Sequence, residues 1–357
     1  MPRLTKISLT QFKNYSYSNF NFAERVIGIC GQNGRGKTNL LDAIYYTCFT
    51  KSYFSKTDAI NVQFDTDGFR LEAIFEAEKI VLINRLGGKK ELQLNEVVYD
   101  KFSHHIGKFP AVMVAPDDVE LITGGSEGRR RFIDTVISQI DEQYLLQLII
   151  YNKVLQQRNS LLKRFAEQGN TDWSLLEVLD GQLIAPGNFI FAVRKAFMLE
   201  LLPLANDLYK TIAANGEETL SLQYESQLHS NNFKNILQQF QQKDMILQRS
   251  NAGIHKDDIS ILLNGQVFKN TASQGQRKSL LFALKLAEFQ LLQIKKGFAP
   301  LLLLDDVFEK LDEVRMQQLL KWVCIENEGQ VFITDTHKER LEMAFNKLGS
   351  AFQLIEL

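Results

Sequence analysis

A segment near the start of the chain has the residue types and spacing of a phosphate-binding loop. It lies between the apolar run Val26–Cys30 and a stretch with helical periodicity from Asn39, and it reads Gly31-Gln32-Asn33-Gly34-Arg35-Gly36-Lys37-Thr38. This fits G-x-x-x-x-G-K-T, in which glycines let backbone N–H groups curve around phosphate and a helix N-terminus adds its dipole. Lys37 would reach the β- and γ-phosphates of ATP, and the Thr38 hydroxyl would bind Mg²⁺. The sequence therefore predicts a P-loop.

An acidic pair follows an apolar run near the other end of the chain. Leu301-Leu302-Leu303-Leu304 is suited to a buried parallel strand, and Asp305-Asp306 come directly after it. In P-loop enzymes, carboxylates at such a strand end hold Mg²⁺ and orient the attacking water. We assign Asp305 to the metal, together with Thr38, and Asp306 to general-base or water-positioning chemistry. Considered alone, the pair could also be an acidic loop after a core strand.

A second loop with anion-binding features narrows the class of P-loop protein. Ala272-Ser273-Gln274-Gly275-Gln276 precedes a helix expected over about 277–294 and resembles the signature loop of ABC ATPases. A serine hydroxyl, glycine N–H groups and a helix dipole again form a phosphate cradle. Because the P-loop already supplies one cradle, we expect Ser273, Gln274, Gly275 and Gln276 to act in trans, on nucleotide bound to another subunit. This predicts an ATP-dependent homodimer.

Two further stretches are similar to ABC elements. Phe308-Glu309-Lys310-Leu311-Asp312 resembles the loop whose aspartate, here Asp312, completes the dimer interface. Ile333-Thr334-Asp335-Thr336-His337 stands where ABC proteins sense the γ-phosphate, and Asp335 and His337 both remain open for that role. The sequence departs from the ABC pattern at three positions, with Ala272 for the usual leucine, Gln274 for a glycine and Asp306 for the usual glutamate.

The elements that must position these residues follow from periodicity. Leu4–Leu9 alternates as a half-buried strand, and the alternating stretches from Phe69 to Val98 flank Gly87-Gly88, a predicted hairpin turn. From about Val119 to Lys210 the pattern is helical. Strand signals return at Thr219–Tyr224 and at Ile259–Phe268, where Asn264-Gly265 predicts a second hairpin. The run at Val331–Thr334 suits another buried parallel strand.

Three stretches outside the ATPase motifs resemble the RecF family, whose members are related to the heads of SMC proteins. They are Leu9–Tyr15, Gly124–Asp134 and Gly253–Asp258, and the resemblance extends over essentially the whole chain. It implies an α/β fold, an ABC-type P-loop ATPase head with an antiparallel β layer and an inserted helical lobe. The ATPase lobe would comprise residues 1–115 and 251–357, and the mostly helical second lobe residues 116–250.

The RecF resemblance also implies a function. It implies a slow Mg²⁺-dependent ATPase that dimerises on ATP, binds single-stranded, gapped or junctional DNA, and works with RecO and RecR to load recombinase at single-strand gaps. Asp306 is one methylene shorter than the usual glutamate, which suits slow turnover. The alternatives are another SMC-like DNA-processing ATPase and, less favoured, a transporter nucleotide-binding subunit, because no Gln-containing loop is evident at 115–118. A P-loop kinase would have no use for the signature-like loop.

Charge and composition limit the partners. Lys plus Arg total 41 against 42 for Asp plus Glu, so any DNA surface must be a local patch. Arg129, Arg130 and Arg131 form the densest cationic group, at the start of an expected helix whose dipole they oppose. They could contact DNA, or form a solvated helix start paired with Glu127 or Asp134.

The remaining sequence features favour a cytoplasmic protein. No apolar run approaches the length of a membrane span or a signal peptide, and the three cysteines are scattered, so we expect buried thiols rather than disulfides or a zinc site. His255 is interpreted as a buried structural histidine rather than a catalytic one.

Overall fold

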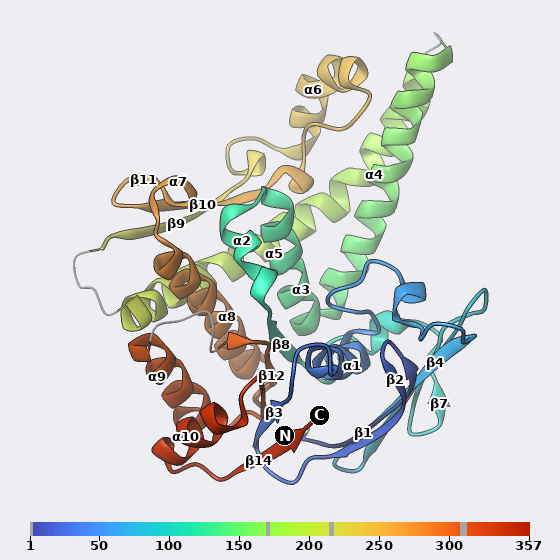
Figure 1. The fold of residues 1–357 in the computed structure, drawn as a ribbon. Coiled ribbons are helices and arrows are strands. Elements are labelled where there is room, and N and C mark those ends of the chain that lie inside the picture. The colour runs from blue at the N-terminus through green and yellow to red at the C-terminus, as the bar shows by residue number, and fades with distance from the viewer. Residues whose placement is uncertain (1–2, 169–171, 214–217, 308–312) are drawn as a thin grey trace. The chain divides into compact units, whose positions relative to one another are not determined.

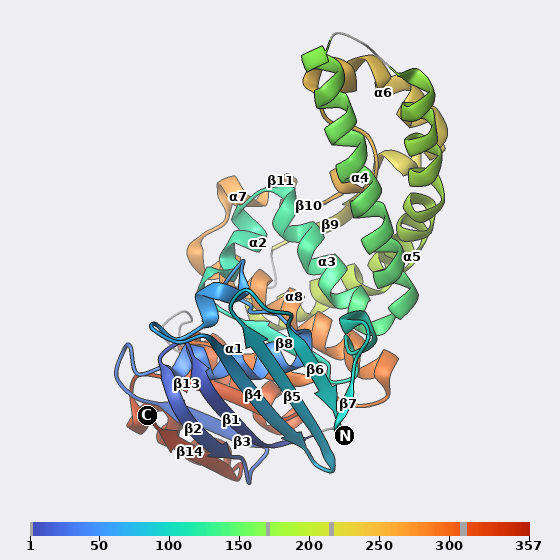
Figure 2. The same cartoon turned by 90° about the vertical axis from the view of Figure 1, so that its right-hand side faces the viewer.

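The computed structural model describes residues 3–168, 172–213, 218–307 and 313–357 (Figures 1 and 2). Contacts divide the chain into a first unit, Met1–Val119, Leu208–Ala214 and Ser273–Leu357, and a second unit, Glu120–Asp207 and Asn215–Ala272. Residues 251–272, which the sequence assigned to the ATPase lobe, group with the second unit because strand β10 (Asp258–Leu263) pairs with β9 (Leu220–Glu225).

A parallel sheet forms the centre of the first unit. Its strand order is β14-β3-β13-β12-β8, and every neighbouring pair is parallel. The strands are β3 (Val26–Cys30), β8 (Ala111–Val114), β12 (Leu301–Leu304), β13 (Val331–Asp335) and β14 (Phe352–Glu356). All residues of β3, β8, β12 and β13 are buried, which confirms the buried parallel strands predicted at 301–304 and 331–334.

The second sheet of this unit is antiparallel, in the order β2-β1-β4-β5-β6-β7. Its strands are β1 (Leu4–Phe12), β2 (Tyr15–Asn21), β4 (Gly68–Phe75), β5 (Glu78–Arg85), β6 (Glu91–Leu94) and β7 (Val97–Val98). Strands β5 and β6 pair across the predicted Gly87-Gly88 turn, where Gly87 has φ 70°. The β layer predicted from the alternating residues is thus confirmed.

Helix α1 (Lys37–Phe49) packs against strands of both sheets. It contacts β1, β4 and β5 of the antiparallel sheet and β8 and β13 of the parallel sheet. Apolar side chains cover almost all of its circumference, as expected for a helix buried in a core rather than lying on a surface. The hydrophobic core around it includes Ile7, Leu9, Leu40, Ile44, Leu71 and Leu303.

Three further helices complete the described part of the first unit. They are α8 (Gln274–Lys296), α9 (Glu313–Lys321) and α10 (Lys338–Leu348), and a π-helical turn at Trp322–Glu326 follows α9. On α8 the predicted buried face is correct for Leu280, Leu284, Ala287 and Leu291. Ile294 is 68% exposed instead, because the last turn of α8, before its Gly297 cap, extends into solvent.

The second unit combines helices with a small sheet. The helices are α2 (Glu120–Thr123), α3 (Ser126–Ile140), α4 (Glu142–Gln168), most of α5 (Trp173–Ala213), α6 (Phe233–Leu247) and α7 (Phe268–Thr271). Strands β9, β10 and β11 (Gln266–Val267) form an antiparallel sheet in the order β11-β10-β9. Asn264 and Gly265 both have positive φ, which confirms the predicted two-residue hairpin.

Short 3₁₀ helices connect these elements. They are Asp58–Asn61, Phe102–His104, Pro116–Val119, Gln227–His229 and Ile254–Lys256. None of the described helices combines the length and apolarity that crossing a membrane requires. Cys30, Cys48 and Cys324 are buried and free, as predicted.

Buried arginines hold the second unit together. Arg158 on α4 pairs with Asp180 on α5 and with Asp244 on α6, 2.7 Å from the latter. Arg194 on α5 lies 2.8 Å from both Asp134 and Asp257. Burying these charges is costly, so each arginine stabilises the unit only while its carboxylates remain in place.

Replacing Arg194 by Met should therefore destabilise the second unit by about 3–5 kcal/mol, since Asp257 would be left buried without its cation. The two tryptophans of the chain allow a local measurement, because Trp173 lies in the second unit and Trp322 in the first. Urea unfolding followed by Trp173 fluorescence in a Trp322→Phe background would report the change.

The matched control is Arg131→Ala, which removes an exposed pair with Glu127 and should cost less than about 1 kcal/mol. Equal unfolding midpoints for the two variants would contradict the stabilising role of the Arg194 network.

Candidate nucleotide-binding site

The predicted P-loop connects β3 to α1. Residues Gln32–Arg35 are exposed, whereas Gly36 and Lys37 are buried. Gly36 has φ 107°, and a Cβ there would lie 2.6 Å from Asn14 Nδ2 and 2.8 Å from the Tyr15 hydroxyl. Only glycine fits this position, so the loop can curve closely above the first turn of α1.

Two residues at the turn between β1 and β2 form hydrogen bonds with the P-loop. The Tyr15 hydroxyl donates to the Gly36 carbonyl at 3.0 Å, and Asn14 Nδ2 donates to the Arg35 carbonyl at 3.2 Å. Asn39 Nδ2 in turn donates to Asn14 Oδ1 at 2.7 Å. Sequence reasoning missed this support, although Asn14 and Tyr15 belong to the first of the three RecF-like stretches.

Lys37 directs its ammonium toward the loop itself. Its Nζ donates to the carbonyls of Gly31 at 2.7 Å and Gln32 at 3.2 Å, and its side chain is buried. These bonds hold the cation beside the loop, in the position from which a P-loop lysine contacts phosphates.

Asp305 connects three elements of the site. Its carboxylate accepts hydrogen bonds from Thr38 Oγ1 at 2.9 and 3.1 Å and from Thr334 Oγ1 at 2.8 Å. Asp305 is 4% exposed, and burial raises its pKa while the two hydroxyl groups act in the opposite direction. The structure thus brings together the two residues that the sequence assigned to Mg²⁺.

These oxygen atoms fit a magnesium ion. Carboxylate and hydroxyl oxygens are ligands that Mg²⁺ accepts, and it usually completes its shell with water and substrate phosphates. Within the described ranges, no group of three or more His, Cys, Asp or Glu side chains could hold a metal. A P-loop magnesium site needs no such group, because the nucleotide itself supplies ligands.

Thr334 also fixes Asp306. The Asp306 N–H donates to Thr334 Oγ1 at 2.9 Å, and the same hydroxyl donates its proton to Asp305. Asp306 has φ 48°, a left-handed conformation that aspartate tolerates better than most residues. One threonine of β13 therefore orients both acidic residues at the end of β12, a role that the strand pattern alone could not indicate.

Asp335 and His337 have different surroundings. Asp335 is buried and accepts hydrogen bonds from the His337 N–H at 2.7 Å and from Arg340 Nη1 at 3.3 Å. His337 exposes 61% of its side chain and lies 2.8 Å from the Thr336 hydroxyl. The Nδ1 of His337 also lies 3.1 Å from Arg340 Nη2, so both residues are engaged at the start of α10, and they differ in that His337 is exposed to solvent.

The signature-like loop caps α8. Ser273 Oγ accepts from the Gln276 N–H at 3.2 Å, and the Gln276 side chain accepts from the Ser273 N–H at 2.6 Å, which together form a capping box. A Cβ on Gly275 would lie 2.2 Å from Nη1 of Arg315 on α9. Arg315 adds a cation that sequence reasoning did not identify. Asp312, predicted at the dimer interface, lies in 308–312, outside the described residues.

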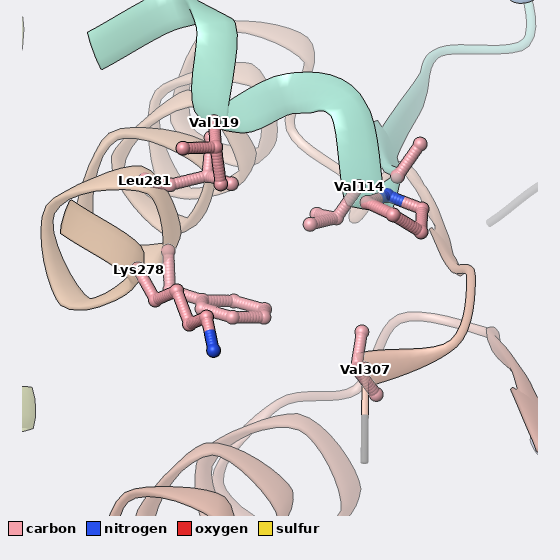
Figure 3. Close-up of a pocket in the computed structure, with 8 residues that line it drawn as sticks. Val114, Val119, Lys278, Leu281 and Val307 are labelled. Atoms are coloured by element: carbon pink, nitrogen blue, oxygen red, sulfur yellow. The ribbon is translucent and has the colours of Figure 1, made fainter. Parts of the chain in front are cut away.

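A small depression lies between the end of β8 and α8 (Figure 3). It is lined by Val114, Ala115, Pro116, Val119, Lys278, Leu281, Phe282 and Val307. Apart from Lys278 these side chains are apolar, so the depression does not suit nucleotide phosphates. In the adjoining segment, Asp118 accepts from the Tyr53 hydroxyl and from the Ala115 N–H, which gives this carboxylate a structural role.

The three arginines predicted to contact DNA differ from one another. Arg129 is buried, and its guanidinium bonds Asp258 at 2.6 and 2.9 Å and the carbonyls of Leu121 and Gly124. Arg130 donates to the Asp257 carbonyl at 2.7 Å, and Arg131 is exposed beside Glu127. Arg129 thus has a structural position, whereas Arg131 is exposed to solvent.

His255 is half-buried in a hydrogen-bonded position. Its Nδ1 lies 2.8 Å from the Tyr151 hydroxyl, its Nε2 lies 3.1 Å from the Ser250 carbonyl, and burial lowers its pKa to about 4. A histidine that stays neutral between two such partners is structural, as predicted.

Comparisons of the sequence with known proteins identify relatives that match nearly the whole chain. A family model described as an AAA domain matches residues 6–350. The DNA replication and repair protein RecF of Flavobacterium johnsoniae is 42% identical over 358 residues, which cover 99% of each chain. RecF of Bacteroides thetaiotaomicron is 40% identical over 359 residues, which cover 99% of this chain and 96% of that protein.

Solved structures show the same relationship. The recombination mediator protein RecF-ATP in the RecFOR pathway superposes with a TM-score of 0.85 at 31% identity, covering 94% of this chain and 92% of that one. The Smc head domain of Pyrococcus furiosus bound to the C-terminal domain of ScpA gives a TM-score of 0.54 at 16% identity, covering 96% and 92% respectively, and shares the fold. With more than 40% identity to a relative over nearly its whole length, the chain belongs to the RecF family of DNA replication and repair proteins.

Proposed function

We propose that this chain is an ATP-controlled DNA-binding switch that hydrolyses ATP slowly. The observation that carries the proposal is the convergence of Thr38 and Thr334 on the buried carboxylate of Asp305, which joins the P-loop to the acidic strand end. A RecF structure described as bound to ATP supports the same ligand here.

In this proposal the nucleotide phosphates lie in the loop Gly31–Thr38, and Thr38 and Asp305 hold Mg²⁺. The ion would neutralise charge on the β- and γ-phosphates. Asp306 then orients the water that attacks the γ-phosphate and accepts its proton, and the short reach of its side chain keeps turnover slow. His337, exposed at the end of β13, is the proposed γ-phosphate sensor.

The signature-like loop is proposed to act on the nucleotide of a second subunit. Ser273 uses its oxygen to accept the Gln276 N–H, so its hydroxyl proton can be donated to a phosphate. Arg315 beside Gly275 adds positive charge to this cradle. A cradle separate from the P-loop of the same chain favours a symmetric dimer with two composite sites, to which Asp312 would also contribute.

Bound as a dimer, the protein would recognise single-stranded, gapped or junctional DNA in the cytoplasm and act with RecO and RecR in loading recombinase. The name RecFOR in the related structure supports these partners. The fold likeness to Smc heads keeps another SMC-like DNA-processing role as the second possibility. Stimulation of ATPase by gapped DNA over intact duplex would favour the gap-repair role, and equal rates would favour the other.

Changing Lys37 to Ala should abolish ATP binding, because it removes the cation that contacts the phosphates. Equilibrium binding of a fluorescent ATP analogue measures the effect, with the exposed Lys56→Ala as the control. If Lys37→Ala keeps ATP-dependent DNA binding at wild-type strength, the P-loop assignment is incorrect.

Changing Asp306 to Asn should leave ATP binding intact but slow hydrolysis on the order of 10²-fold, because an amide orients but does not activate water. The dimer should then persist on DNA, as measured by size-exclusion chromatography with light scattering. Asp117→Asn, an exposed carboxylate of the same unit, should change neither property. A wild-type rate of ATP hydrolysis in Asp306→Asn would mean that another residue activates the water.

Changing Ser273 to Arg should fill the signature cradle while leaving the P-loop unchanged. The variant should bind ATP as a monomer and lose most hydrolysis. Mixed with Lys37→Ala, it should regain part of the activity, because one composite site would then pair an intact P-loop with an intact signature loop. ATP-dependent dimers formed by Ser273→Arg alone would contradict the model.

A further inference from the structure

Four cationic side chains gather on the second unit from three separate stretches of sequence. They are Arg130 on α3, Lys243 on α6, Arg249 after α6, and Lys256 in the 3₁₀ turn Ile254–Lys256, and we call them the cation cluster. Arg130 Nη1 donates to the carbonyl of Asp257, the residue after Lys256, at 2.7 Å. The hydrogen bond between His255 and the Ser250 carbonyl brings the neighbours Arg249 and Lys256 together.

The cations are close enough to influence one another. The pKa of Lys256 is lowered by burial first, and then by the charges of Arg249, Arg130 and Lys243, while the carboxylate of Asp244 acts in the opposite direction. Like charges in proximity repel, so this arrangement carries a local cost that a bound anion would relieve.

The carboxylates of this region are engaged elsewhere. Asp244 pairs with Arg158, Asp257 with Arg194, and Asp258 with Arg129, in each case through a buried arginine. Within the described part of the chain, none of the four cluster cations lies within 4.0 Å of a carboxylate. Lys243, Arg249 and Lys256 are exposed and Arg130 is half-buried, so these cations present positive charge to solvent.

The loop that carries two of the cations has a fixed conformation. Gly253 has φ 125°, and a Cβ there would lie 2.5 Å from the Tyr151 hydroxyl and 2.8 Å from Phe233 Cζ. His255, which is neutral, must donate its Nε2 proton to the Ser250 carbonyl and accept the Tyr151 proton at Nδ1. The backbone that carries Arg249 and Lys256 is therefore fixed before any ligand binds, which lowers the entropy cost of ordering the loop on binding.

We propose that the cation cluster of Arg130, Lys243, Arg249 and Lys256 is a binding site for the phosphate backbone of DNA. The proposal rests on the DNA-binding function proposed above and assigns residues to it. A set composed only of charged groups suits repeated phosphates rather than base edges, so the contact should be independent of sequence and sensitive to salt. It also accounts for two of the RecF-like stretches, Gly124–Asp134 and Gly253–Asp258, which meet through the Arg130 and Arg129 contacts.

The test is the triple variant Lys243→Ala/Arg249→Ala/Lys256→Ala. Arg130 is left unchanged because it also bonds the Asp257 carbonyl. The matched control, Lys153→Ala/Lys163→Ala/Arg164→Ala, removes the same charge from exposed positions of α4 in the same unit. Anisotropy of a labelled gapped duplex, with ATP present and over a salt series, gives affinity and salt dependence, and a fluorescent ATP analogue checks the nucleotide site separately.

The triple variant should bind gapped DNA at least about tenfold more weakly, and its slope of log affinity against log salt should fall by roughly 2 to 3, because about 0.9 counterions are released per phosphate contact. The control variant and Lys243→Arg/Lys256→Arg should remain close to wild type. ATP binding should be unchanged in all of them.

Unchanged DNA affinity and salt slope in the triple variant would overturn the assignment. The same variants are also titrated with poly-glutamate. If the triple variant loses binding to poly-glutamate but retains binding to DNA, the assignment is overturned in favour of an acidic polypeptide ligand. If the wild-type protein with ATP binds no DNA, the proposed function itself fails, a result distinguishable from failure of the cluster alone.

Discussion

The hydrogen bonds that converge on the buried Asp305 carboxylate join the three elements that form the nucleotide site. Thr38 comes from the first turn of α1, Thr334 from β13, and Asp305 from the end of β12. A carboxylate at this depth is unfavourable without donors, so the position of each threonine is constrained by the charge it must satisfy. The same Thr334 hydroxyl accepts a hydrogen bond from the backbone N–H of Asp306, so a single side chain links Asp305, the proposed metal ligand, to Asp306, the proposed catalytic residue.

The second unit is stabilised by a different arrangement of charge. Its arginines 129, 158 and 194 are buried and bonded to carboxylates, whereas the cation cluster lies at the surface without such partners. Because the overall charge of the chain is nearly balanced, a positive surface must be local, and near the cation cluster the carboxylates of Asp244, Asp257 and Asp258 pair with buried arginines. The positions of these aspartates therefore affect both the ion pairs inside the second unit and the charge at its surface.

Local patterns in the sequence were sufficient for much of the fold, and they singled out Thr38 and Asp305, which the structure brings together. The P-loop, the hairpins at Gly87-Gly88 and Asn264-Gly265 and the strand before Asp305 depend on short-range spacing and on glycine conformations. The contacts that support the site could not be predicted this way. Thr38 and Asp305 are 267 residues apart in the chain, and Asn14, which contacts the P-loop, lies in the turn between β1 and β2. The three adjacent arginines show the limit clearly. With about 3.6 residues per helical turn, neighbours on α3 point in different directions, so one is buried while another reaches solvent.

The strand order of the parallel sheet also governs when the first unit can form. β3 carries the P-loop at its end, yet both strands that pair with it, β13 and β14, come from the last 30 residues of the chain. During synthesis β3 therefore has unpaired edges until β13 and β14, which follow it much later in the chain, have emerged, and its five buried residues lack their neighbours for as long. The second unit, by contrast, has all its paired strands and buried ion pairs within residues 120–272. The order of translation thus favours folding of the second unit first, with the nucleotide site completed only after β12 and β13 have emerged from the ribosome.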